Sequence, residues 1–333
     1  MIEIIREHES DLEKLAYTGT ALSFLGSLFI FWSYCVIKGL NRSPAFRMIF
    51  HLSITDFLLT INGIINVNAP EIEEDHPKFC QVWGFARGYI SLSSMFWPFA
   101  FAHSMHCFYN GSFRSQNDWK KKIKYYKFFC WGLPIAFAVL PLFFNAYGAS
   151  DIYCWLKVPD LPGKTQQELM EIKFWLAIIS YYGPVTIIVL LMLFYYIKII
   201  RYLIMNPSSE ANTVFYSLFF YPLIVMITYF FSVGDRFINI PSGHPTLFMI
   251  QAHLILRQLQ GFLNAVVYCM GRKFREKFKK HFSHRRDQKN KKFMYYSDHD
   301  SMNSSNSDSS FLNISSFHTS ARSPMNPNFL QNY

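Results

Sequence analysis

Seven long apolar stretches are the feature of this sequence that most constrains its fold. They run over Leu15–Ile37, Met48–Val67, Val82–Tyr109, Tyr125–Ala146, Phe174–Ile200, Thr213–Val233 and Thr246–Met270. As a helix, each is long enough to cross a hydrocarbon core about 30 Å thick. A chain crossing lipid must satisfy its backbone hydrogen bonds internally, which favours helices. The sequence therefore predicts an all-α integral membrane protein, a bundle of seven transmembrane helices at residues 15–270.

The overall composition agrees with a membrane protein. Hydrophobic residues make up 51% of the chain and charged residues only 16%, whereas a soluble domain contains about 25% charged residues. The gaps between the apolar stretches are short, so no separate soluble domain is expected before Gly271. Residues 1–14 are predicted to be a short extracellular segment without the features of a cleaved signal peptide.

Basic residues predict how the helices are oriented in the cell membrane. They cluster in alternate gaps, at Lys38–Arg47, Arg114–Lys127 and Lys198–Arg201, and after the last stretch at Arg272–Lys292. Lys and Arg close to span ends favour the cytoplasmic side. We therefore expect an extracellular N-terminus and a cytoplasmic C-terminus. The net charge of +10 is then a consequence of topology, and no nucleic-acid partner is expected.

Two of the six cysteines fall on the predicted outer side. Cys80 opens the third apolar stretch and Cys154 lies in the loop between the fourth and fifth. Disulfides persist in oxidising compartments such as the cell exterior. We expect a Cys80–Cys154 disulfide that ties this loop across the mouth of the bundle. The other four cysteines lie in or at the ends of spans, where a lone cysteine is usually a small buried apolar residue.

Several short motifs resemble those of one receptor family. They are LSITDF at Leu52–Phe57, CQVWGFARGYISLSSMFW at Cys80–Trp97, CW at Cys154–Trp155, YPL at Tyr221–Leu223 and LQGFLNAVVY at Leu259–Tyr268. With seven spans and an outer cysteine pair, they resemble the cyclic AMP receptor-like group of G protein-coupled receptors. The resemblance implies a receptor, not an enzyme, that binds an extracellular small-molecule ligand, such as cyclic AMP, and activates a heterotrimeric G protein without a cofactor. The chain departs from rhodopsin-like receptors, because it lacks an Asp-Arg-Tyr triplet after span three and has NAVVY in span seven.

The last apolar stretch carries polar residues along one side. At helical spacing, His253, Arg257, Gln260, Asn264 and Tyr268 share one face. Polar groups are costly in lipid, so this face should point into the bundle. Guanidinium groups bind phosphate and carboxylate well. We therefore regard Arg87, Arg236, His253 and Arg257 as candidate ligand-binding residues. The alternative is structural pairing of Arg87 and Arg257 with helix carbonyls or Asp235.

A second group of polar residues lies deeper and suggests an activation switch. Asp56 is the only acidic residue inside a predicted span. Asn264 lies at a similar depth, where the two side chains would meet through water or a sodium ion. Tyr268 lies one helical turn further towards the cytoplasm. By resemblance, Asn264 and Tyr268 occupy positions used in receptor activation; the alternative is a static hydrogen-bonded core. No metal-ligand cluster is expected, because His51, His103 and His106 lack the spacing.

The segment after the last span has two parts. At residues 271–284, Phe274, Phe278 and Phe282 recur at helical spacing among basic residues, which predicts an amphipathic helix lying on anionic membrane lipids. Residues 285–333 are rich in serine and are predicted to be a disordered cytoplasmic tail. Candidate phosphorylation sites in it are Ser304, Ser305, Ser309 and Ser310.

Three other function classes fit this sequence less well than a receptor. A retinal-binding protein needs a Schiff-base lysine, and the seventh stretch has none. A membrane enzyme needs a catalytic constellation, and no nucleophile or phosphate-loop motif is found. A multi-span transporter is the second interpretation, although internal repeats typical of transporters are not evident.

Overall fold

A computed structural model describes residues 2–67, 77–111, 116–150, 153–206, 218–231, 247–283 and 286. The chain divides into two units, Met1–His281 and Phe282–Tyr333. The long helices and both strands belong to the first unit. Its long helices are α1 (Ile2–Val36), α2 (Pro44–Val67), α4 (Pro77–Tyr109), α5 (Gln116–Val139), α6 (Gln166–Ala177), α7 (Gly183–Met205) and α9 (Leu247–Met270). Leu218–Phe231 and residues 272–283 are also helical.

The helices lie where the apolar stretches predict them. Each of the seven stretches overlaps a described helix. Among the described residues, four segments are long and apolar enough to cross a membrane: Tyr17–Val36, Pro44–Ile65, Asp118–Phe144 and Gln166–Met205. The prediction of a mostly helical, multi-pass membrane protein is therefore confirmed.

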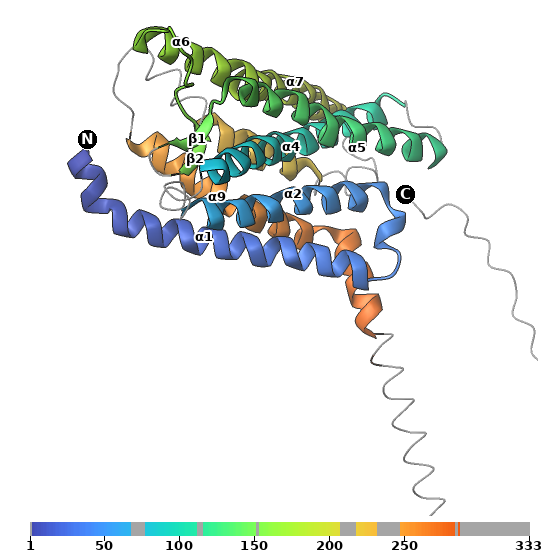
Figure 1. The fold of residues 1–333 in the computed structure, drawn as a ribbon. Coiled ribbons are helices and arrows are strands. Elements are labelled where there is room, and N and C mark those ends of the chain that lie inside the picture. The colour runs from blue at the N-terminus through green and yellow to red at the C-terminus, as the bar shows by residue number, and fades with distance from the viewer. Residues whose placement is uncertain are drawn as a thin grey trace, which may run out of the picture. The chain divides into compact units, whose positions relative to one another are not determined.

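Helix α4 is enclosed by other elements. It packs against α2, α5, α7 and a β-hairpin, and it runs between α2 and the upper helices in Figure 1. Ser91, Ser93 and Ser94 are all buried on it. A helix surrounded by protein can carry such polar residues, because they find partners there and avoid lipid. This placement explains why α4 is less apolar than the four segments above.

Helices α1 and α9 pack closely although they are far apart in the sequence (Figure 1). A Cβ atom added at Gly26 would lie 3.0 Å from the Gly261 carbonyl oxygen. The Phe262 backbone N–H donates to the Ser23 hydroxyl across 3.2 Å, and that hydroxyl donates to the Gln258 carbonyl. Small residues let two backbones approach in this way within membranes.

The loop between α5 and α6 contains the one described departure from helical structure. Strands β1 (Tyr147–Ser150) and β2 (Tyr153–Leu156) pair antiparallel, with Ala149 opposite Cys154. The sequence did not predict this hairpin, which forms because backbone groups outside a helix still need partners and this loop pairs with itself. The predicted disulfide is present. Cys80 and Cys154 are bonded, with Cα atoms 4.9 Å apart, which fixes β2 to the first turn of α4.

A single π-turn, η3 (Ile178–Tyr182), joins α6 to α7. The Gly183 N–H donates to the Ile178 carbonyl oxygen, and a Cβ atom at residue 183 would lie only 2.7 Å from that oxygen. Pro184 follows directly and has no N–H to donate. The Gly183-Pro184 pair therefore marks an irregular turn between the two helices.

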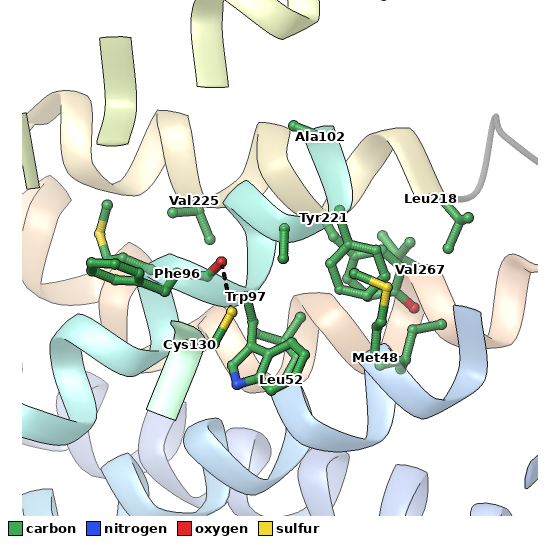
Figure 2. Close-up of a cluster of buried hydrophobic side chains, with 14 of the residues drawn as sticks. Met48, Leu52, Phe96, Trp97, Ala102, Cys130, Leu218, Tyr221, Val225 and Val267 are labelled. Carbon is green, nitrogen blue, oxygen red and sulfur yellow. Dashed lines mark hydrogen bonds between the residues drawn. The ribbon is translucent and has the colours of Figure 1, made fainter. Parts of the chain in front are cut away.

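A cluster of large buried side chains holds the middle of the first unit together (Figure 2). The Phe101 ring on α4 stacks on Tyr221 with ring centroids 5.3 Å apart. The Cys130 thiol on α5 donates to the Phe96 carbonyl oxygen across 3.4 Å. Trp97 is fully buried and stacks on His51 of α2 at 4.8 Å. These contacts join α4 to α2, to α5 and to helix 218–231.

Candidate functional site

Arg257 is the centre of a polar network that joins four helical segments. Its Nη1 donates to the Tyr229 hydroxyl at 2.9 Å and to the Tyr181 hydroxyl at 3.2 Å. Its Nη2 donates to the Ser91 hydroxyl. These partners lie on helix 218–231, on η3 and on α4. Within the described part of the chain, no carboxylate lies within 4.0 Å of this guanidinium, and the three partners named above are neutral hydroxyls.

A narrow cavity opens beside Arg257, between α1, α2, α4 and α9. Its volume is about 30 Å³, and its polar lining comprises Ser23, Asp56, Thr60, Arg87, Arg257, Gln258 and Gln260. A water needs roughly 10–15 Å³ on this measure, so the space holds about two waters. The predicted ligand arginines and the predicted switch aspartate therefore line one cavity. It is too small for a nucleotide-sized ligand, which would require the helices to separate.

Asp56 lies at the inner end of this network and is 3% exposed. Its carboxylate accepts from Asn264 Nδ2 at 2.7 Å and from Gln260 Nε2 at 3.2 Å. Gln260 also donates to the Ser94 hydroxyl. The sequence predicted that Asp56 and Asn264 meet through water or sodium; instead they are in direct contact. Among the described residues, the buried Asn264 Oδ1 has no hydrogen-bond partner.

Tyr268 connects α9 to α1 and to the following helix. Its hydroxyl is 2.9 Å from the Ser33 hydroxyl, and its ring lies 4.3 Å from that of Phe274. Phe274 is buried in the bundle core. Phe274, the first ring of the predicted amphipathic helix, therefore packs against the bundle through Tyr268 and Phe29. Phe278 is half-buried.

The structure brings together most of the described residues that the sequence singles out. Arg257, Gln260, Asn264 and Tyr268 all hydrogen-bond to other helices, so the polar face of α9 points inward as predicted. Arg236, the side chain of His253, and Ser304, Ser305, Ser309 and Ser310 lie outside the described residues. Among the described residues, no group of three His, Cys, Asp or Glu side chains is arranged to hold a metal ion.

Sequence reasoning did not identify Tyr181 and Tyr229. Both hydroxyls accept from Arg257, and the Tyr181 ring packs edge-on against Trp155 of β2, with centroids 5.1 Å apart. A buried tyrosine usually needs a partner for its hydroxyl. Tyr181 lies two residues before Gly183-Pro184 in an apolar stretch, so this rule could have indicated from the sequence that its hydroxyl has a polar partner.

Comparison with known proteins places the chain in a family. The model of the slime mold cyclic AMP receptor family matches residues 6–310. The chain belongs to this family. It is 25% identical over 270 residues to cyclic AMP receptor-like protein A of Dictyostelium discoideum, covering 81% of this chain and 67% of that protein.

More distant relatives are also named as receptors. G-protein coupled receptor 1 of Arabidopsis thaliana is 22% identical, over 75% of this chain and 74% of its own length. G-protein coupled receptor Mth2 of Drosophila yakuba is 23% identical, over 66% of this chain and 42% of its own. The slime mold cyclic AMP receptor family thus provides the framework for the polar network around Arg257: a multi-pass, receptor-like membrane protein.

Proposed function

We propose that this chain is a seven-span G protein-coupled receptor that binds an extracellular small-molecule ligand and activates a heterotrimeric G protein. The observation that carries the proposal is the continuous polar face of α9. It runs from Arg257, bonded to three other segments, through the Asp56–Asn264 contact to Tyr268 and Phe274. A movement at the Arg257 end would change contacts at the Phe274 end. Such an element, with two possible arrangements, is what a transmembrane signal requires.

The distribution of disulfide and charge supports the orientation in this proposal. The Cys80–Cys154 bond and the hairpin lie at the end of α4 where the helix begins. The exposed lysines Lys120 and Lys121 begin α5, and Lys279 and Lys280 lie beyond α9. A disulfide suits the cell exterior and a basic surface suits the cytoplasm. The N-terminus would then be extracellular and the C-terminus cytoplasmic.

The chemistry of the network favours a ligand with a negatively charged group. Three hydroxyl groups accept hydrogen bonds from Arg257 without neutralising its charge. Arg87 lines the same cavity. An anionic ligand entering between the helices would form charge-assisted hydrogen bonds with both arginines. These bonds are stronger than the bonds to neutral hydroxyls that they would replace. Cyclic AMP, named in the family and in one relative, is the first ligand to test.

The experiment measures ligand-stimulated nucleotide exchange on purified G proteins by the receptor in membranes. We expect cyclic AMP or another small anion to accelerate exchange. Arg257→Lys keeps the charge and should weaken the response less than Arg257→Ala, which should lose about tenfold or more in potency. Both variants are normalised to surface protein. Vectorial uptake of a solute without nucleotide exchange would instead identify a transporter.

A further inference from the structure

A cluster of positive charge is built where the turn after α1 meets helix 272–283. Lys277 Nζ donates to the Gly39 carbonyl oxygen at 2.6 Å, and it lies 5.7 Å from the centroid of the Phe46 ring. Gly39 has φ +87, a left-handed conformation that glycine adopts at little cost. The ammonium group is therefore held in place by a backbone acceptor and an aromatic face.

Two further cations surround Lys277. Lys273 lies one helical turn before it, and Arg42 ends the short 3-10 turn Leu40–Arg42 that follows Gly39. Partial burial, with the nearby charges of Lys273 and Arg42, lowers the pKa of Lys277. Burial likewise lowers the pKa of Lys273. Lowered values mean that these ammonium groups are charged at an energetic cost, which an anion would relieve.

In the described part of the chain, no acidic side chain forms an ion pair with this cluster, although the charge of Glu276 raises the pKa of Lys273. None lies within 4.0 Å of Arg42, Lys273 or Lys277, and Glu276 is engaged by Arg272 Nε at 2.9 Å. The other basic residues of the helix differ. Arg275, Lys279 and Lys280 are exposed to solvent, whereas Lys273 and Lys277 are half-buried. Arg42 is also exposed, so the cluster differs from the rest of the basic surface through the anchored Lys277 and the half-buried Lys273 beside it.

We propose that Arg42, Lys273 and Lys277 form a binding site for clustered phosphate groups, supplied by the headgroup of a multiply phosphorylated membrane lipid. Three convergent cations match several negative charges on one small headgroup better than the single charge of an ordinary anionic lipid. The site begins three residues after the end of α9, close to the membrane boundary, where a lipid headgroup can reach it. This inference rests on the proposed orientation, which places the site at the cytoplasmic leaflet.

The chain offers a matched control for this proposal. The triple variant Arg42→Gln/Lys273→Gln/Lys277→Gln removes the cluster. The triple variant Arg275→Gln/Lys279→Gln/Lys280→Gln removes the same number of charges from exposed positions on the same helix. Because Lys277 also anchors the Gly39 turn, the double variant Arg42→Gln/Lys273→Gln keeps that anchor. It is paired with Arg275→Gln/Lys279→Gln. Thermal unfolding verifies that each protein is folded.

The experiment titrates the purified full chain in detergent with short-chain phosphatidylinositol bisphosphate and counts bound lipids by native mass spectrometry. We expect the cluster variants to bind at least about tenfold more weakly than the parent, and the control variants to stay within about twofold. Short-chain phosphatidylserine should bind equally weakly to all. Soluble inositol trisphosphate should compete, but with lower affinity than the lipid.

Three results would overturn the proposal. Equal losses in the cluster and control variants would show that only net charge matters. Phosphatidylserine binding as tight as that of the bisphosphate lipid would show that the site does not read clustered phosphates. Inositol trisphosphate binding as tight as the lipid would assign the site to a soluble compound. The assay uses neither an extracellular ligand nor a G protein, so its failure is distinguishable from failure of the proposed receptor function.

Discussion

The Tyr181 hydroxyl lies 3.2 Å from Nη1 of Arg257. The ring of the same tyrosine packs against Trp155, with ring centroids 5.1 Å apart. Trp155 follows Cys154 of the disulfide. Tyr181 therefore connects the outer hairpin with the polar centre of the bundle. Its position depends on the π-turn, a feature that often marks functional sites.

Removing the Tyr181 hydroxyl tests this connection. Tyr181→Phe keeps the ring against Trp155 but leaves one Arg257 donor without its acceptor. Hydrogen bonds to charged groups contribute about 1.5–3 kcal/mol, so we expect a clear fall in the unfolding temperature in detergent. Tyr202→Phe is the control, because no hydrogen bond to the Tyr202 hydroxyl is found among the described residues. Equal unfolding temperatures for parent and Tyr181→Phe would contradict the prediction.

The π-turn itself depends on Gly183. In Gly183→Ala the new methyl group would lie 2.7 Å from the Ile178 carbonyl oxygen, so the backbone must shift. We expect destabilisation of about 1–3 kcal/mol and a weakened ligand response, because Tyr181 moves with the turn. Gly63→Ala is the matched control, since nothing lies within 4 Å of a Cβ atom there. Thermal unfolding and nucleotide exchange on the G protein are measured for both variants. Identical results for the two would show that the π-turn does not require glycine at residue 183.

Close packing of α1 on α9 should be sensitive to side-chain size at Gly26. Gly26→Val places branched carbon against the Gly261 carbonyl and the Phe262 backbone, both within 3.1 Å of the new Cβ atom. Overpacking of this kind costs about 1–3 kcal/mol, so surface abundance and thermal stability should fall. Gly132→Val on α5 meets only the edge of the Phe128 ring at 3.9 Å and should be tolerated better. The reverse ranking would disprove this packing.

Loss of the outer disulfide should impair folding. Cys80→Ser or Cys154→Ser frees the hairpin from α4, and removal of a native disulfide often costs about 2–5 kcal/mol. We expect reduced delivery to the cell surface, measured by surface labelling. Cys130→Ser is a useful comparison at a buried cysteine without a disulfide. Mass mapping that found both Cys80 and Cys154 as free thiols in surface protein would contradict the prediction.

Asp56 should govern signalling more than expression. Asp56→Asn preserves shape but presents an amide to the Asn264 and Gln260 donors, which destroys one good acceptor and costs about 1–3 kcal/mol. We expect altered basal or ligand-driven nucleotide exchange, with the protein still reaching the surface. The control is Asp160→Asn, at an exposed loop position. Unchanged dose–response curves would assign Asp56 a purely structural role.

Local patterns in the sequence determined several features of the protein. Apolar length predicted where the helices lie, because a lipid-spanning helix needs about 20 apolar residues whatever its neighbours are. Helical spacing predicted the inward face of α9, since Arg257, Gln260 and Asn264 lie on one side of it. The pairing of Cys80 with Cys154 was predicted because only these two cysteines lie on the side that the charge pattern predicts to be outside.

Only the tertiary structure decided how those faces meet. It placed Tyr181 and Tyr229 on Arg257 from segments 76 and 28 residues away, and it brought Asp56 into direct contact with Asn264. It also buried Phe274 against Tyr268 and paired Lys277 with Gly39. Such contacts depend on helix rotation, on the π-turn and on close approach at glycines. These are set by packing among distant segments, and no local pattern encodes them.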